Sequence, residues 1–451
     1  MKQTKAVPAK IFDDFLTRIQ LDAETLDELA RTTGWSKAEP RKISLAQLLM
    51  ALSMESVQGE ASFNDLSSRI HLLNKDGGPS RQAVSKRINA PFLKVLEALL
   101  AKAIAAKTDC ESLSCQDSSL ACYARVLIQD STVIRLPAWL FARFSGVSNA
   151  HQTVCNARIQ ATYDIKNMVF VSFEICPYSD NDLRAAPRLK LAENDLVLRD
   201  RGYLIAAEVA RHSASGACCI YRHKTGTTYL DEQTGEPIDL LAELRRNGKL
   251  DRTVMLGDRE RTRVRLVSAP VSEEVANHRR MKAKKEMRGH NPSAEVLALM
   301  DWTIFLTTAA KEVDFAAILR IYGLRWRIEI IFKTWKSHLN FDAIHRVSDV
   351  GLRSILTMRL VMITEGTNVL YRCCHSHVKR HHDRELSLQK FLKRLGRSPE
   401  LADMITQALA DLSREPSEPE DEQTRETWNH LVRYCCYDKR KRKNFFDQSN
   451  G

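Results

Sequence analysis

Between residues 124 and 221 this chain of 451 residues changes from helical spacing to a succession of short apolar segments. Such segments, bounded by turn residues, read as strands over 125–129, 157–163, 168–173, 196–198 and 217–221. The turn signal at 164–167 predicts a hairpin between the second and third strands, and a helix is expected over 203–212. Strands followed by strand–helix units predict an α/β core. The first two acidic candidates, Asp130 and Asp200, each follow a strand of this region directly.

The region before this core, residues 1–115, has apolar side chains at helical spacing and predicts a helical N-terminal domain. Ser80 is a good N-cap, and the helix that follows it would turn Arg81, Gln82 and Lys86 toward solvent. The recognition helix of a helix-turn-helix presents such a face to the major groove, so these three are candidate DNA contacts. The connection before Ser80 is longer than the usual turn, which leaves a solvated helix of a bundle as the alternative.

After the first part of the core, residues 116–221, the chain changes character again. Residues 222–300 have strand signals at 253–256 and 263–267 and a basic helix over 271–288, and we expect a mostly β insertion. This helix lines a DNA channel or forms a solvated face. A strand over 302–307 and a long helix over 315–339 begin the last part of the core, residues 301–370. Residues 371–451 are expected to be a helical C-terminal region, with an acidic linker at 415–422 and a basic tail at 439–443.

The helix expected over 315–339 carries four polar side chains on one stripe. Tyr322, Arg325, Glu329 and Lys336 follow the spacing Y-x2-R-x3-E-x6-K, which places them within about 60° at about 100° per residue. Arg325 and Glu329 could form an ordinary i,i+4 ion pair on an amphipathic helix. Alternatively, Glu329 binds a metal ion beside cations that hold phosphate. Trp326, which flanks the stripe, is expected to pack in the core.

The choice depends on whether other carboxylates can meet Glu329. Three carboxylates brought together repel one another unless a cation lies between them. Oxygen ligands suit Mg²⁺ or Mn²⁺ rather than zinc, and two such ions can assist an in-line phosphoryl displacement. Asp130 and Asp200 are the candidate partners, although each taken alone could be a cap or turn residue.

The sequences Ile-Gln-Asp130-Ser-Thr, Arg-Asp200-Arg-Gly-Tyr and Y-x2-R-x3-E-x6-K occur in this order. Together they resemble the motifs of bacterial insertion-sequence DDE transposases of the IS-four family, over roughly residues 120–370. The resemblance implies an RNase H-like catalytic core interrupted by a mostly β insertion and flanked by helical N- and C-terminal domains. It also implies that Asp130, Asp200 and Glu329 form a catalytic triad that binds two Mg²⁺ ions, with Mn²⁺ as a substitute.

The same resemblance implies DNA contacts near the element's end. Tyr322, Arg325 and Lys336 would hold phosphates, with Lys333 on the same helix as a further DNA contact, and arginine and lysine suit this role. Trp302 lies where related enzymes keep a tryptophan that stacks on a flipped base; the alternative is a core position on the returning strand.

The expected activity is cut-and-paste transposition: water activated by metal attacks a phosphodiester at the terminal repeats, and the freed 3′-hydroxyl attacks target DNA. The formal net charge of +12 agrees with a polyanionic partner. We expect double-stranded DNA and a homodimer in a synaptic complex, no membrane partner, and a reduced, cytoplasmic location with association to the nucleoid. A DNA-binding regulator that no longer cuts is the alternative function; a two-carboxylate sugar hydrolase would leave the cationic stripe unexplained.

Overall fold

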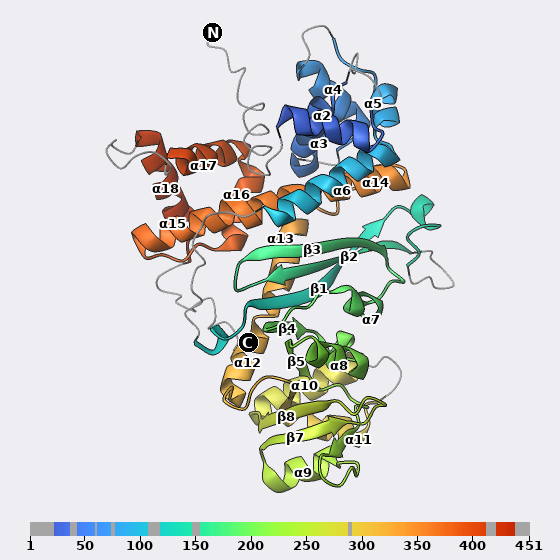
Figure 1. Cartoon of the computed structure of the whole chain (residues 1–451), viewed down its shortest axis with the longest axis vertical. Helices are drawn as coiled ribbons and strands as arrows, with labels where there is room; N and C mark the ends of the chain where they lie inside the picture. Colours follow the sequence, from blue (N-terminus) through green and yellow to red (C-terminus); the bar gives the residue numbers. More distant parts are fainter. Residues whose placement is uncertain are drawn as a thin grey trace.

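The computed structural model describes residues 22–36, 43–58, 61–73, 77–106, 118–146, 154–286, 291–411 and 421–437. The expected basic tail at 439–443 and most of the acidic linker at 415–422 lie outside these residues. In Figure 1 a central sheet lies between helices from the two ends of the chain, above it, and a smaller α/β lobe below it. Within the described part, no helix is long and apolar enough to cross a membrane.

The described strands belong to one nine-stranded mixed sheet with the order β3-β2-β1-β4-β5-β9-β8-β7-β6. They are β1 (Arg125–Leu136), β2 (Cys155–Asp164), β3 (Val169–Pro177), β4 (Asp195–Arg199), β5 (Cys218–Arg222), β6 (Tyr229–Asp231), β7 (Leu250–Leu256), β8 (Arg263–Pro270) and β9 (Trp302–Thr307). The α/β character expected from the sequence is confirmed, and so is the hairpin of β2 and β3.

The strand that carries Asp130 does not end there. β1 continues to Leu136 because its antiparallel partner β2 runs alongside it, from Leu127 opposite Asp164 to Leu136 opposite Cys155. Only the parallel partner β4 stops early, with Arg199 opposite Gln129. Asp130 therefore lies in the middle of its own strand, next to the point where the neighbouring strand β4 ends.

The segment 222–300 contains β6, β7 and β8 together with α9 (Leu240–Asn247), α10 (Glu273–Glu286) and α11 (Ala294–Leu299). It is mixed α/β rather than mostly β, because Asp239 and Ser293 cap helices whose apolar residues pack into the same small core. Its strands join the central sheet through β9, which pairs with β5 on one side and β8 on the other. Segment 222–300 thus extends the central sheet.

The long helix expected over 315–339 is two helices, α12 (Phe315–Gly323) and α13 (Trp326–His338). Tight i→i−3 hydrogen bonds from Leu324 and Arg325 close the turn between them, next to a glycine that disfavours helix. α13 is fixed by Trp335, which is fully buried among rings of β3 and of its own neighbourhood, with its ring centroid 5.3 Å from that of Phe170. Glu329 therefore sits on a firmly packed helix that lies against β1.

The remaining helices surround this core. The N-terminal ones are α2 (Ala23–Thr32), α3 (Leu45–Gln58), α4 (Phe63–Leu73), α5 (Arg81–Arg87) and α6 (Ala90–Ala105). α7 (Asp182–Ala185) and α8 (Ala206–Ala214) connect β3, β4 and β5. The C-terminal ones are α14 (Asp349–Thr364), α15 (Arg372–His382), α16 (Leu388–Arg397), α17 (Pro399–Asp411) and α18 (Glu422–Tyr434), with a π-helical segment, Glu365–Tyr371, between α14 and α15. α6 packs against α14, and both contact β3.

Candidate active site

The two aspartates are brought together by strand register. β1 and β4 are parallel, and Gln129 pairs with Arg199 in the last rung of their ladder. The next residues, Asp130 within β1 and Asp200 directly after β4, therefore lie at the same level on neighbouring strands. Asp200 caps a short turn, where its Oδ2 accepts a hydrogen bond from the Gly202 N–H at 3.2 Å.

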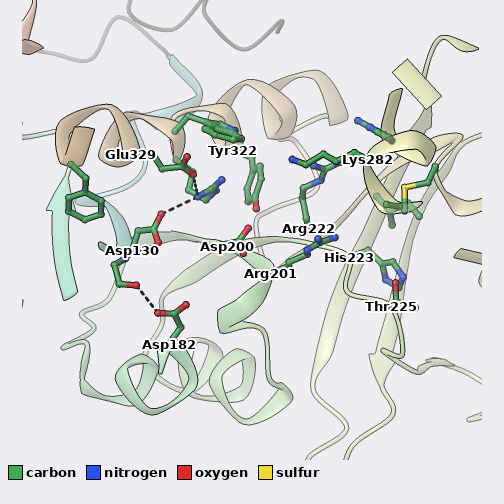
Figure 2. Close-up of a pocket in the computed structure, with 18 of the residues that line it drawn as sticks. Asp130, Asp182, Asp200, Arg201, Arg222, His223, Thr225, Lys282, Tyr322 and Glu329 are labelled. Carbon is green, nitrogen blue, oxygen red and sulfur yellow. Dashed lines mark hydrogen bonds and ion pairs between the residues drawn. The ribbon is translucent and has the colours of Figure 1, made fainter. Parts of the chain in front are cut away.

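Glu329 reaches the same place from α13. The three acids line one cleft with a volume of about 870 Å³, shown in Figure 2. The cleft is bounded by the middle of β1, the end of β4, α12, α13 and parts of segment 222–300. Its lining includes every predicted catalytic residue and, from the same stripe, Tyr322, Arg325, Lys333 and Lys336. Residues from three distant parts of the sequence thus line one continuous cleft.

Arg325 joins two of the acids. Its Nη1 lies 3.3 Å from Asp130 Oδ2 and 2.8 Å from Glu329 Oε1, and its side chain is only 7% exposed. The i,i+4 pair expected from the spacing therefore exists, but its arginine is buried and also contacts a residue 195 positions away. Burial alone would lower the pKa of Arg325, yet Tyr322, Asp130 and Glu329 around it raise that pKa.

The surroundings of Asp130 disfavour its ionised form, which a bound cation would stabilise. Burial raises the pKa of Asp130 to about 7, with further raising from Glu329 and Asp182, while the Ser131 N–H and Arg325 act in the opposite direction. Within the described residues, no three His, Cys, Asp or Glu side chains are arranged to hold an ion as they stand. The acids line the cleft without converging, and Arg325 supplies the positive charge between two of them. Their all-oxygen donor set suits a hard divalent ion.

The other stripe residues make specific contacts. The Tyr322 hydroxyl donates to the Arg199 carbonyl at 3.3 Å, and burial raises its pKa. Lys336 donates to the Val133 carbonyl at 2.8 Å, and partial burial lowers its pKa. Lys333 is exposed at the cleft. Tyr322 and Lys336 are thus held by backbone carbonyls, whereas Lys333 is exposed at the cleft.

Of the two tryptophans that line the cleft, Trp326 differs from expectation. Trp302 lies in the cleft wall, partly buried, and its indole N–H donates to the Gly248 carbonyl at 2.9 Å. Trp326 was expected in the core, but its side chain is 56% exposed and lines the cleft. The bend between α12 and α13 turns Trp326 outward, and the Arg325 guanidinium lies 5.0 Å from its ring centroid. Trp326 is thus the more accessible aromatic face of the two.

The structure adds cleft residues that sequence reasoning missed. Asp182 comes from α7, and Arg201 and Arg222 come from the segments that follow β4 and end β5. Asp182 and Arg222 belong to no recognisable spacing, whereas Arg201 is part of the sequence Arg-Asp200-Arg-Gly-Tyr but is not among the residues predicted for the site. Of the basic helix α10, Arg279 and Lys282 line the cleft. In Figure 2 the acids lie on one side of the cleft, and the cations Arg201, Arg222 and Lys282 lie on the other.

The predicted recognition helix lies elsewhere. α5 follows Ser80, whose side chain accepts from the Ala83 N–H, and Val84 is buried while Arg81, Gln82 and Lys86 are exposed. The helix thus turns the predicted face to solvent. None of these three residues lines the cleft.

Comparison with known proteins gives a consistent result. A family model described as "Transposase DDE domain" matches residues 124–364. The transposase for insertion sequence element IS231C of Bacillus thuringiensis subsp. berliner is 26% identical over 416 residues, covering 84% of each chain. The putative transposase InsL for insertion sequence element IS186A of Escherichia coli (strain K12) is 26% identical over 339 residues, covering 71% of this chain and 84% of that one. Among solved structures, a piggyBac transposase synaptic complex with hairpin DNA matches with a TM-score of 0.45 and 10% identity, over 94% of this chain and 85% of that chain.

The family model spans more than half of the chain and includes all three acids of the cleft. DDE transposases are DNA-cutting and DNA-joining enzymes that use divalent metal ions. This chain belongs to the DDE transposases of bacterial insertion sequences.

Proposed function

We propose that Asp130, Asp200 and Glu329 are the catalytic residues of this transposase and that they hold two Mg²⁺ ions, for which Mn²⁺ can substitute. The observation that carries the proposal is the meeting of all three in one cleft, two by strand register and one from α13. Carboxylate oxygens are the ligands that Mg²⁺ prefers. Bound there, the ions would supply an activated water and offset the charge of the phosphodiester.

The cations of the cleft then have a defined task. Arg325, Lys333 and Lys336 would hold backbone phosphates of the element's end, with Arg325 exchanging its carboxylate partners for phosphate oxygens. Tyr322 would contribute a hydroxyl donor from the same wall. Two aromatic side chains, Trp302 and the more exposed Trp326, offer faces on which an unstacked base can rest.

We also propose that β1–β5 form an RNase H-like core into which residues 222–300 are inserted. The support is the strand order β3-β2-β1-β4-β5, with a β1–β3 meander and β4 and β5 parallel to β1. On this layout residues 1–115 are the helical DNA-binding domain, 116–221 and 301–370 the two parts of the core, and 371–451 the helical C-terminal region.

Cutting by this site should depend on its acids. The test incubates the full-length protein with a duplex that carries the terminal inverted repeat flanking its gene, in Mg²⁺ and in Mn²⁺, and follows nicking on a denaturing gel. Asp130→Asn, Asp200→Asn and Glu329→Gln should each abolish nicking but retain end binding. Asp349→Asn, which removes a carboxylate from the distant α14, is the matched control and should nick normally. Normal nicking by Asp130→Asn would refute the site, and wild-type protein that binds ends without nicking would favour a regulator.

The exposed face of α5 is proposed to recognise the terminal repeat in the major groove through Arg81, Gln82 and Lys86. Gln82→Ala should reduce the preference for the repeat over random duplex, whereas Arg81→Ala and Lys86→Ala should also reduce the salt dependence of binding. Lys102→Ala, on the exposed surface at the far end of α6, is the control. Fluorescence anisotropy at several salt concentrations measures these effects, and unchanged discrimination in Gln82→Ala would contradict the proposed groove contact.

Excision requires a cut at both ends of an element, so we propose that two copies of the chain act together as a homodimer in a synaptic complex. Light scattering after size-exclusion chromatography, with and without end duplex, tests this. A complex that contains one protein chain and two ends would contradict it.

A further inference from the structure

Asp182, the acid of the cleft that belongs to no motif, is the centre of a hydrogen-bond network. Its Oδ1 accepts from Ser131 Oγ at 3.0 Å, from Arg158 Nη1 at 3.0 Å and from Gln160 Nε2 at 3.1 Å. The Ser131 contact is the lower dashed line in Figure 2. Arg158 Nη1 also donates to Ser131 Oγ at 2.9 Å, so the three groups close a triangle. One carboxylate oxygen thus gathers side chains from β1 and β2.

The network lies on the face of the sheet opposite to the Asp130 side chain. Successive side chains of a strand point to opposite faces of the sheet, so Ser131 faces away from Asp130 and from α13. Ser131 is directly opposite Gln160 in the β1–β2 register, so these two side chains share a face. α7 covers that face and presents Asp182 to both. Asp182 therefore contacts β1 on one face of the sheet, next to the point where the Asp130 side chain projects from the other face.

The same network reaches the second acid. Gln160 accepts through its Oε1 from the Tyr203 hydroxyl at 2.9 Å. Tyr203 is fully buried at the end of the short turn that Asp200 caps. Side-chain hydrogen bonds therefore run without a break from Ser131, next to Asp130, through Asp182 and Gln160 to the turn of Asp200.

We propose that Asp182 is a positioning residue that ties Ser131 to Gln160 and so fixes the separation of Asp130 and Asp200. The inference rests on the metal site of the proposed function and adds a residue to it. Strand register brings Asp130 and Asp200 to the same level, but β1 has no strand neighbour beyond Gln129 on its β4 side, so backbone pairing does not hold the two acids themselves. A carboxylate is suited to the task because charged acceptors make shorter and stronger hydrogen bonds. The guanidinium of Arg158 offsets the negative charge of the Asp182 carboxylate.

The test measures Mn²⁺ binding to the full-length protein from the loss of the free-ion electron paramagnetic resonance signal. Asp182→Ala should weaken Mn²⁺ binding by about tenfold, the lower end of the range for partners that orient metal ligands. Asp182→Asn keeps an oxygen acceptor and should stay within about threefold of wild type. Asp180→Asn, two residues away and paired with Arg188, is the matched control and should bind like wild type. Nicking rates of an end duplex in Mn²⁺ should follow the same order.

The outcomes separate the possibilities. Wild-type Mn²⁺ affinity in Asp182→Ala would overturn the inference. So would an Asp182→Asn variant that binds Mn²⁺ as weakly as Asp182→Ala, since that result indicates that the Asp182 carboxylate binds the ion directly. Tyr203→Phe removes one hydroxyl and keeps the buried ring; an affinity lower than wild type supports the link to Asp200, and unchanged affinity refutes it. If Asp182→Ala fails to fold by circular dichroism, the Tyr203→Phe result decides. Wild-type protein that binds no Mn²⁺ would instead overturn the metal site of the proposed function.

Discussion

The buried ion pair of Arg199 and Glu208 offers a strong test of how the site is supported. Arg199 directly precedes Asp200, and its side chain has no exposed surface. Its Nη1 donates to Glu208 Oε2 at 2.9 Å, and Glu208 is 3% exposed. Arg211, at 29% exposure, donates to the same carboxylate. Glu208→Gln keeps the shape of the side chain but leaves the Arg199 cation buried without a counter-charge.

The size of the effect follows from burial. Removing one partner of a buried pair costs about 3–5 kcal/mol, because the remaining charge keeps its desolvation penalty. The contact with Arg211, whose side chain is partly exposed, adds less than about 1 kcal/mol. At about 2–4 °C per kcal/mol for a core of this size, Tm should fall by about 6–20 °C. The matched control is Glu174→Gln, since the Glu174–Arg188 pair is more than a third exposed on both sides and should shift Tm by no more than about 4 °C.

Differential scanning fluorimetry and urea unfolding measure this change. The double variant Arg199→Met/Glu208→Leu removes both charges and should recover most of the lost stability, because well-packed apolar residues can replace a buried ion pair. A Glu208→Gln protein that melts no lower than Glu174→Gln would refute the reasoning. So would a double variant less stable than Glu208→Gln, since the loss would then come from packing or hydrogen bonds rather than from an unpaired charge.

Three further outcomes are expected. Arg325→Lys keeps the charge but removes the planar guanidinium whose Nη1 contacts both Asp130 and Glu329, so single-turnover nicking should fall by about 10²-fold, and a rate within threefold of wild type would contradict the bridge. Gly396→Ala would place a Cβ 2.7 Å from the His338 carbonyl oxygen, so urea unfolding should show a loss of about 1–3 kcal/mol; an unchanged midpoint would show that α13 and α16 can separate freely. Burial, and then Arg199, lower the pKa of His212 from 6.5 to about 3, so only the unfolded chain takes up this proton between those values. The stability that His212 contributes is complete above pH 6.5 and is lost as pH falls, by up to about 1.4 kcal/mol per pH unit. Urea unfolding of His212→Gln at several pH values should therefore show a free energy of unfolding that changes less steeply with pH than that of wild type.

Much of the core could be predicted because its signals are local. The hairpin turn at 164–167, the apolar runs of β4 and β5, and the limits of β9 are properties of neighbouring residues, and the structure has them within a few positions. The end of β1 was misplaced because the length of a strand depends on its partner. β2, which extends β1 to Leu136, is contributed by a separate segment of the chain.

The candidate site divides in the same way. The motif residues Asp130, Asp200 and Glu329 could be named from order and spacing, and the cleft contains all three. The exposure of Trp326 could not be predicted, because a uniform helix was assumed where the chain bends at Leu324 and Arg325. Segment 222–300 extends the sheet because β9 pairs with β5. The periodicity of apolar residues in the sequence does not indicate which strands pair.

The residue types of this chain thus specified its chemistry: strands that lead into acids, a carboxylate among cations, and an excess of positive charge for a nucleic acid. Tertiary structure decided how those groups are held. Arg325 meets Asp130 across 195 residues, and Asp182 joins β1, β2 and the turn of Asp200 without any motif. Local spacing reports which side chains share one helix or strand, whereas contacts between distant segments arise only when sheet register and helix packing bring those segments together.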